Sequence, residues 1–277
     1  MPLYIGTTIR EGNKMLEIVI FSKDRPCQLD LLLRSIRDHF NYGFKIHILY
    51  KYTNEEYMKG YNLLESFNYV SNTNFVLENL FYEDVVSIVG SIPERYICFL
   101  VDDDVIFRAI NDLSVIKLLE DPNVLTVSTR LGLNTNHCYP VNITTGIPTI
   151  VNNCWCWRSG AGGDWSYPMS LDGNIFRKEE IVQILNKERF NGPNELEGKL
   201  CNETPNRALM ACYPESKTIN IPANKTQSVL PNRCADSFSI KELNDLYLNG
   251  YKIKTDNIYT CNNNSPHYEI TYEFTRE

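Results

Sequence analysis

The sequence predicts an α/β fold in which helices cover a parallel β-sheet. Short apolar runs alternate with segments whose apolar residues recur at helical spacing through residues 16–104. The run at 96–101, Tyr-Ile-Cys-Phe-Leu-Val, is apolar throughout, which is typical of a strand buried on both faces. This alternation favours parallel pairing of the strands through right-handed crossovers.

The expected elements follow one another in a regular order over the first half of the chain. Pro26 suits the first turn of a helix, and Asn54 suits an N-cap that is followed by acidic residues. We expect strands at 16–21, 44–50, 74–77 and 96–101, and helices that begin at Pro26 and Asn54 or span 82–92.

The second half of the chain has a weaker pattern. We expect a helix at 111–120, a strand at 124–129 and a helix at 177–188. Residues 135–163 show no clear period, and connections of this length are usually functional or mobile. Ser239 and Glu242 form a capping-box pattern for a further helix, and Gly250 suits its end.

Composition narrows the class of protein. A length of 277 residues suits one large domain, and the net charge of −7 argues against a generic nucleic-acid surface. No apolar run approaches the ~20 residues of a membrane span, and residues 1–17 lack the apolar segment of a signal peptide. Nine cysteines at irregular spacings then favour reduced thiols and a cytoplasmic protein. Nothing in the sequence indicates an oligomeric state.

Three consecutive carboxylates, Asp102, Asp103 and Asp104, follow the apolar run directly. Ligands of open α/β sheets bind beyond the carboxyl ends of the strands, and adjacent acids are stabilised by a divalent cation. In an extended segment Asp102 and Asp104 point to one side, where Asp104 contacts the metal and Asp102 contacts ribose or metal-bound water. Asp103 is expected to point away. The alternative is an acidic turn that caps the next segment.

A polar turn, Ser22-Lys23-Asp24-Arg25-Pro26, ends the first predicted strand. It lies on the same sheet edge as the acids, where its side chains are placed to meet a nucleotide. The alternative is an ordinary solvated turn. No G-x-G-x-x-G pattern follows the strand, so nothing supports a dinucleotide cofactor.

This ordered set of motifs resembles a GT-A-fold glycosyltransferase of the nucleotide-sugar-dependent, family 2-like kind. Residues 22–26 resemble the nucleotide-binding turn of these enzymes, and 102–104 resemble their D-x-D motif. Residues 167–173 resemble a donor- and acceptor-side segment, and 193–197 fall where the acidic catalytic motif lies. The resemblance covers roughly residues 16–250.

The resemblance implies a Rossmann-type mixed sheet flanked by helices, in a single domain over 1–277 with a nucleotide-binding half at 1–104 and an elaborated acceptor-side half at 105–277. It also implies a Mn²⁺ or Mg²⁺ cofactor, a nucleotide-sugar donor that we expect to be a uridine diphosphate sugar, and a glycan or other hydroxyl acceptor. Inverting transfer is expected. Processive members carry membrane helices that this sequence lacks, so transfer of single sugars is expected.

The resemblance also suggests roles for particular residues. Glu197 is the first candidate for the catalytic base, Glu195 the second and Asp172 the third, because the acidic motif here is Glu-x-Glu and not a contiguous Glu-Asp pair. The alternative for both glutamates is favourable charge in a first helical turn, and Asp172 has the further option of binding donor-sugar hydroxyls.

Other candidates fall into three groups. Donor-binding candidates are Ser22, Lys23, Asp24, Arg25, Asp102, Asp103 and Arg233, with Lys225 as a weaker one; acceptor-binding candidates are Trp155, Trp157 and Trp165; metal candidates are Asp104, Asp102 and His267. Core packing is the alternative for the tryptophans, and a structural role is the alternative for the histidine. Residues 227–233 loosely resemble a later motif of processive members.

Three other functions compete with glycosyl transfer. A non-catalytic glycan- or nucleotide-binding module would not need the acid triplet. A sugar nucleotidyltransferase would favour a glycine-rich, basic first turn, which 22–26 is not. A glycoside hydrolase also uses two carboxylates, but it would not need the nucleotide-like turn.

Overall fold

A computed structural model describes residues 16–40, 44–226, 233–235 and 237–276. Its centre is one eight-stranded sheet with the strand order β3-β2-β1-β4-β10-β6-β11-β9. The strands are β1 Leu16–Lys23, β2 Ile46–Lys51, β3 Thr73–Leu77, β4 Tyr96–Val101, β6 Val124–Ser128, β9 Cys154–Cys156, β10 Asn174–Arg177 and β11 Leu209–Cys212. The predicted α/β class, a mixed sheet flanked by helices, is confirmed.

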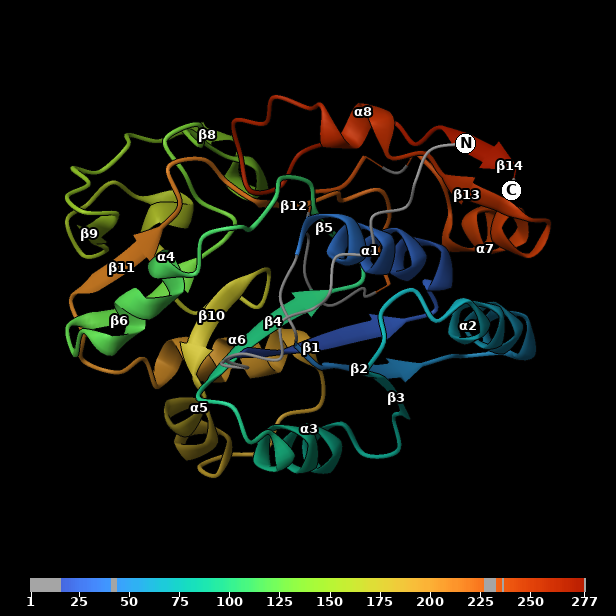
Figure 1. Ribbon diagram of the computed structural model, residues 1–277, viewed down its shortest axis with the longest axis horizontal. Coiled ribbons are helices and arrows are strands. Elements are labelled where there is room, and N and C mark those ends of the chain that lie inside the picture. The colour runs from blue at the N-terminus through green and yellow to red at the C-terminus, as the bar shows by residue number, and fades with distance from the viewer. Residues whose placement is uncertain (1–15, 41–43, 227–232, 236, 277) are drawn as a thin grey trace, which may run out of the picture.

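Helices cover both faces of this sheet. They are α1 Pro26–His39, α2 Glu55–Phe67, α3 Phe81–Ser91, α4 Ser114–Lys117, α5 Lys178–Leu185, α6 Pro193–Asn202, α7 Ile240–Leu248 and α8 Asp256–Tyr259. Helices α1 and α2 lie on one side of the sheet, and α3 and α5 lie on the other (Figure 1). The alternation of strand and helix up to β4 agrees with the order expected from the sequence.

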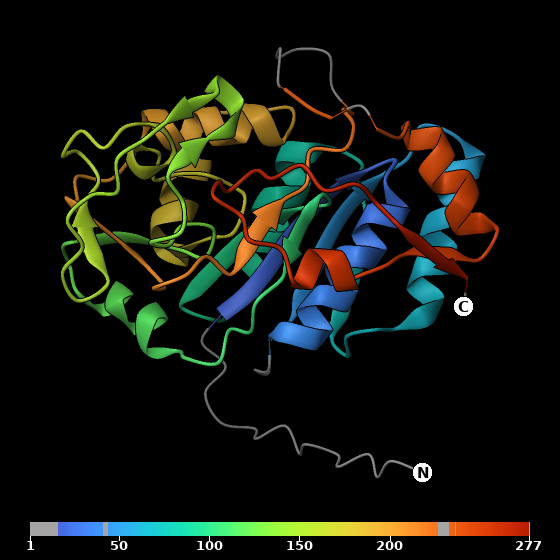
Figure 2. The same cartoon turned by 90° about the horizontal axis from the view of Figure 1, so that it is seen from above.

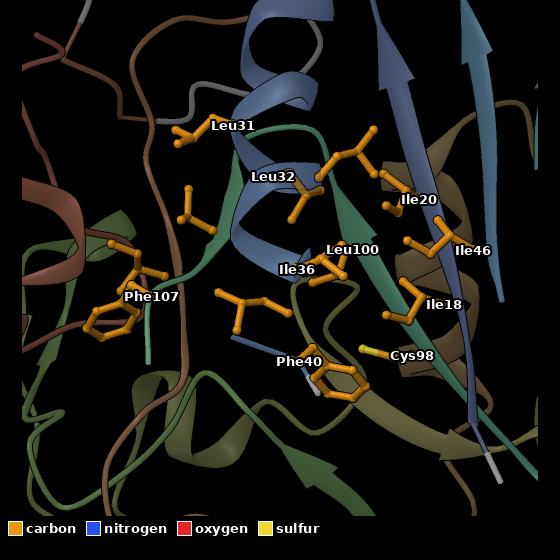
Figure 3. Packing of buried hydrophobic residues seen from close by; sticks show 14 of the residues in the cluster. Ile18, Ile20, Leu31, Leu32, Ile36, Phe40, Ile46, Cys98, Leu100 and Phe107 are labelled. Atoms are coloured by element: carbon orange, nitrogen blue, oxygen red, sulfur yellow. The ribbon is translucent and has the colours of Figure 1, made fainter. Parts of the chain in front are cut away.

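The two faces of β1 feed two separate cores, because successive side chains of a strand point to opposite sides. Ile18 and Ile20 pack toward α1, where they join Leu32 and Ile36 (Figure 3). Val19 and Phe21 pack in the second cluster, with α3 and α5. Burial on both faces explains why the central strands are apolar at almost every position.

Parallel pairing holds for the first four strands and then changes. Strand β1 pairs with β2 and β4 in parallel, and β2 pairs with β3 in parallel. Strand β10 runs antiparallel to both of its neighbours, β4 and β6. The apolar pattern does not encode this reversal, since a buried strand has the same composition in either direction.

The smaller elements depart from the expected pattern in two places. The predicted helix at 111–120 is shorter, because α4 is followed by a 3₁₀ turn at Leu118–Glu120. The segment 135–163 contains strands β7 His137–Cys138, β8 Ile143–Thr144 and the sheet-edge strand β9. The remaining short strands are β5 Asp104–Ile106, β12 Thr218–Asn220, β13 Tyr251–Ile253 and β14 Phe274–Arg276.

The predicted capping residues of α2 and α7 are confirmed, whereas α5 ends at Leu185 and not at the predicted residue 188. The Asn54 side chain accepts hydrogen bonds from two backbone N–H groups of α2. Ser239 and Glu242 form a complete capping box at the start of α7. Gly250, with φ at +81°, follows that helix in the left-handed region that glycine tolerates.

Within the part of the chain that the structure describes, none of the helices is both long and apolar enough to cross a bilayer.

Gly132 packs closely against the backbone of Glu215 and Ser216, and substitution of this glycine tests that contact. A Cβ atom at this position would lie 2.3 Å from the backbone N of Ser216, so Gly132→Ala must displace backbone. We expect a loss of about 1–3 kcal/mol in the free energy of unfolding, measured by chemical denaturation. The matched control is Gly90→Ala in α3, where nothing lies within 4 Å of the new atom; equal stability of the two variants would contradict this packing.

Candidate active site

Topology gathers the predicted site residues at one edge of the sheet. Since β10 is antiparallel to both β4 and β6, the carboxyl ends of β4 and β6 lie at the edge where β10 begins. The carboxyl end of β1 lies there too, because β1 is parallel to β4. Residues 22–25, 102–104, 129–130 and 167–173 therefore meet along this edge, where ligands of open α/β sheets bind.

Asp102 joins the polar turn to the acid triplet. Its Oδ2 accepts hydrogen bonds from Ser22 Oγ at 2.9 Å and from the Lys23 backbone N–H at 3.0 Å. Its Oδ1 pairs with Arg25 Nη1 at 3.0 Å. Burial raises the pKa of Asp102 to about 6, although Arg25 opposes that rise.

Arg25 holds a second carboxylate of the triplet. Its Nη1 lies 2.8 Å from Asp103 Oδ2, and its Nη2 donates to the Asn224 backbone oxygen at 2.5 Å. The expectation that Asp103 points away from its neighbours is therefore wrong. Residues 102 and 103 form a turn between β4 and β5, so the alternation of an extended strand does not apply to them.

Asn220 brings the second half of the chain onto the triplet. It ends β12, which pairs with β5, the strand that begins at Asp104. Figure 2 shows these two strands side by side at the middle of the molecule. Its Nδ2 donates to Asp103 Oδ1 at 2.9 Å and to Asp104 Oδ1 at 3.1 Å. No local motif marks this residue, and our sequence analysis missed it.

Asp104 is completely buried and has only neutral partners in the described structure. Besides Asn220, its side chain accepts a hydrogen bond from the Val101 backbone N–H at 2.9 Å. Burial, followed by repulsion from Asp172 and Asp103, raises the pKa of Asp104 well above its usual range. A cation near Asp104 would relieve this penalty.

A second acidic group surrounds Arg130, which follows β6. The Arg130 guanidinium is 4% exposed; it pairs with Asp164, donates to Ser170 Oγ and lies 3.6 Å from Asp172 Oδ2. Neither Arg130 nor Asp164 was predicted as a site residue, whereas Ser170 lies in the predicted segment 167–173. A signal for Arg130 did exist, since it directly follows the predicted strand at 124–129 on the ligand edge.

Glu197 lies beside this acidic group. It is half-buried in α6, and its Oε1 accepts the Leu171 backbone N–H at 3.0 Å. Burial and repulsion from Asp172 raise the pKa of Glu197 to about 7. A carboxylate with such a pKa is suited to take a proton at neutral pH.

Glu195 lies in a different environment on the same helix. Its Oε2 accepts hydrogen bonds from the backbone N–H and the side-chain amide of Asn191, at 2.9 and 3.0 Å, and the residue is exposed. The two glutamates are separated by two positions on a helix and therefore do not share a face. Of the two, Glu197 is the one that lies with Asp172.

His267 lies at the same edge, across from the triplet. It forms an isolated β-bridge with Asn220, and its Nε2 is 3.5 Å from Asp172 Oδ2. Burial, together with the charge of Arg130, lowers the pKa of His267, so its ring is neutral at pH 7. Its Nδ1 has no hydrogen-bond partner among the described residues.

These features suit a divalent cation, because a neutral imidazole with an unpartnered nitrogen and an uncompensated carboxylate are both metal-ligating groups. Across the described residues, however, no three His, Cys, Asp or Glu side chains are already spaced as a metal cluster. Asn220 connects two of the predicted ligands, since it donates to Asp104 and forms the β-bridge with His267. The third, Asp102, is bound by Ser22, Lys23 and Arg25.

Two further donor-side candidates, Asp24 and Arg233, have partners within the protein. Both carboxylate oxygens of Asp24 accept hydrogen bonds from Thr53, at 2.7 and 3.1 Å. Arg233 donates to Asn142 Oδ1 at 3.0 Å and lies over the ring of Tyr139. Of the loosely matching segment 227–233, only its last residue falls within the described residues.

Two of the three tryptophans belong to the core. Trp155 and Trp165 are each 1% exposed and pack edge to face with ring centroids 4.9 Å apart. Their indole N–H groups donate to backbone oxygens. This burial corrects the predicted sugar platform at Trp155 and Trp165, since neither ring has a face open to a ligand. Trp157 is partly exposed and donates to the Arg207 backbone oxygen.

Comparison with known proteins places this geometry in context. No protein-family model matches the chain. The bifunctional glycosyltransferase pgtA of Dictyostelium discoideum is 28% identical over 213 residues. The chain resembles a glycosyltransferase. The aligned part is 66% of this chain and 27% of pgtA, so the chain spans about a quarter of that protein's length. The resemblance expected from the motifs is confirmed by this match.

Two solved structures also align with the chain. Residues 1–349 of TarS from S. aureus align with a TM-score of 0.48 and 11% identity, covering 74% of this chain and 59% of that solved chain. The mannosyltransferase PcManGT from Pyrobaculum calidifontis was solved with GDP-Man and Mn²⁺. It aligns with a TM-score of 0.47 and 9% identity, covering 73% of this chain and 55% of the PcManGT chain.

The raised pKa of Asp104 gives a direct test of cation binding. A protonated carboxyl must lose its proton to ligate a metal, so the affinity for Mn²⁺ should rise with pH and binding should release protons. Asp104→Asn should weaken Mn²⁺ binding strongly and remove most of that pH dependence. Titration calorimetry in buffers of different ionisation enthalpy measures both quantities. Unchanged affinity in Asp104→Asn would remove this residue from the metal site.

Proposed function

We propose that this chain is a metal-dependent glycosyltransferase of GT-A type. It moves one sugar from a nucleotide diphosphate sugar to a hydroxyl acceptor, with inversion at the anomeric carbon. One observation carries the proposal: Arg25 pairs with Asp102 and Asp103, and Arg130 pairs with Asp164 and Asp172, whereas Asp104 and Glu197 have no direct cationic partner among the described residues. These two are the carboxylates that a cation and a proton transfer require.

The donor would bind along the polar turn and the triplet. Ser22, Lys23 and Arg25 are fixed there by Asp102, so the turn is held rigidly beside the acids. Arg25 pairs with Asp103 beside this turn, and we assign these two residues to the diphosphate and the ribose. A uridine diphosphate is our choice of nucleotide, on the strength of the family resemblance.

The acceptor side supplies the proton chemistry. The acceptor hydroxyl attacks the anomeric carbon, the bond from that carbon to the diphosphate oxygen breaks, and Glu197 takes the hydroxyl proton. Asp172 lies next to Glu197, and its negative charge makes Glu197 a stronger base. A bound Mn²⁺ or Mg²⁺, held by Asp104 with Asp102 and His267, would neutralise the charge that develops on the nucleoside diphosphate.

The cysteines bear on where this chemistry takes place. The eight cysteines other than Cys234 are free thiols, and four of these eight are not buried. Free thiols persist in a reducing compartment, which supports our proposal of a cytoplasmic location.

Competition by free nucleotides tests the donor assignment. We expect UDP with Mn²⁺ to inhibit sugar transfer, or hydrolysis of the donor, more strongly than GDP or dTDP. Thermal-shift measurements with the same nucleotides provide a binding readout that does not depend on the acceptor. Stronger binding of GDP would reverse the choice of nucleotide, and release of pyrophosphate in place of a nucleoside diphosphate would indicate a nucleotidyltransferase.

Substitution of the two glutamates of α6 tests the base. Glu197→Gln should bind donor and Mn²⁺ nearly as the parent does but transfer sugar at least ~10²-fold more slowly, since general-base catalysis contributes about 10²–10⁴-fold. Glu195→Gln is the matched control on the same helix and should keep parental turnover, because Glu195 bonds only to Asn191 in the described structure.

Other results would change this mechanism. If Glu195→Gln or Asp172→Asn loses turnover while Glu197→Gln keeps it, the base is the residue whose substitution abolishes turnover. Parental turnover in all three variants would reject a carboxylate base at this site.

A further inference from the structure

We propose that Arg130 is a positioning residue of this site: its guanidinium holds Asp164 and Asp172 in place and so leaves Glu197 as the carboxylate that receives the acceptor's proton. This inference rests on the proposed glycosyl transfer and deepens it. Arg130 does not need to touch either substrate, because it acts through the acids around it.

The contacts of Arg130 connect three separate segments. The residue follows β6, while Asp164 belongs to the 3₁₀ turn Gly163–Ser166 and Ser170 belongs to the segment before β10. Arg130 Nη2 pairs with Asp164, and Nη1 both donates to Ser170 Oγ and faces Asp172. A planar guanidinium with several fixed donors can make all of these contacts at once, which a lysine ammonium does less well.

Ser170 transmits this fixation to Asp172. The Ser170 hydroxyl lies 3.4 Å from Asp172 Oδ2 and accepts the Asp172 backbone N–H at 3.2 Å. Leu171, which lies between Ser170 and Asp172, donates its backbone N–H to Glu197. Arg130 therefore fixes the short segment 170–172 that contacts the proposed base.

Charge balance gives Arg130 a second effect on Glu197. The groups that face Glu197 are Asp172, whose charge disfavours its ionised form, and Arg130, whose charge favours it. Tyr167 and Cys201 are also adjacent, and both are neutral at pH 7 because burial raises the pKa of each. Removal of Arg130 leaves the repulsion from Asp172 unopposed, so Glu197 should hold its proton to higher pH.

The test is the pH dependence of kcat/KM for sugar transfer. In Arg130→Gln we expect the acid limb to move to higher pH by about one pH unit, with activity partly recovered in alkaline buffer. Arg130→Lys keeps the positive charge but loses the several fixed donors of the guanidinium. The acid limb of its pH profile should therefore stay near the parental position, while kcat falls. NMR titration of the Glu197 carboxyl carbon in the parent and in Arg130→Gln gives the same displacement without an activity assay.

A second variant covers the case in which Arg130→Gln does not fold. Asp164→Asn removes one of the acids that compensate Arg130, so the acid limb should move to lower pH. Arg189→Gln, at an exposed arginine paired with Glu83, is the control and should leave the profile unchanged.

An equal loss of rate at every pH in Arg130→Gln, with no displacement in Asp164→Asn, would mean a purely structural role and overturn the proposal. A parental chain that turns over no nucleotide sugar would instead reject the proposed function, and the NMR titration would still report on Arg130.

Discussion

The site depends on the attachment of Asp102 to the turn after β1. One carboxylate receives a serine hydroxyl, a backbone N–H and an arginine, all from residues 22–25. The apolar strands β1 and β4 bring the two segments to the same edge, and the buried polar contacts fix their relative position. Loss of Arg25 or of Asp102 would leave the other charge buried without compensation, which typically lowers the free energy of unfolding by about 3–5 kcal/mol.

Charge is distributed unevenly over this edge. Arg25 compensates Asp102 and Asp103, and Arg130 compensates Asp164 and Asp172. Such pairs stabilise ionised carboxylates in a buried setting. Asp104 and Glu197 have no such pair, and their pKa values are raised; burial also raises the pKa of Asp102 to about 6 in spite of Arg25. The two arginines thus separate acids that serve the architecture from acids that remain available for ligands and protons.

Much of this arrangement could be predicted from local patterns. The apolar strand before Asp102 and the capping residues of α2 and α7 are read from neighbouring residues, and the rule of carboxyl ends then places Ser22 through Arg25 next to the acids. The position of Asn220 could not be predicted in this way, because it depends on pairing across more than 100 residues, as in the 116 positions between Asp104 and Asn220. Arg130 directly follows the predicted strand at 124–129, but no local pattern indicated its partner Asp164. The tryptophans show the opposite problem, since their residue type suits a sugar platform and a core equally well.

Contacts between the C-terminal half and the N-terminal half determine when the site forms during folding. Arg25 and Asn224 are 199 positions apart in sequence, and Asp30 bonds to Tyr247 across 217. Contacts of such separation close last, since loop entropy must be overcome first. During synthesis, the acid triplet would therefore emerge long before the segments that cover it. A nascent chain would expose an acidic strand end until residues 220–224 have been synthesised.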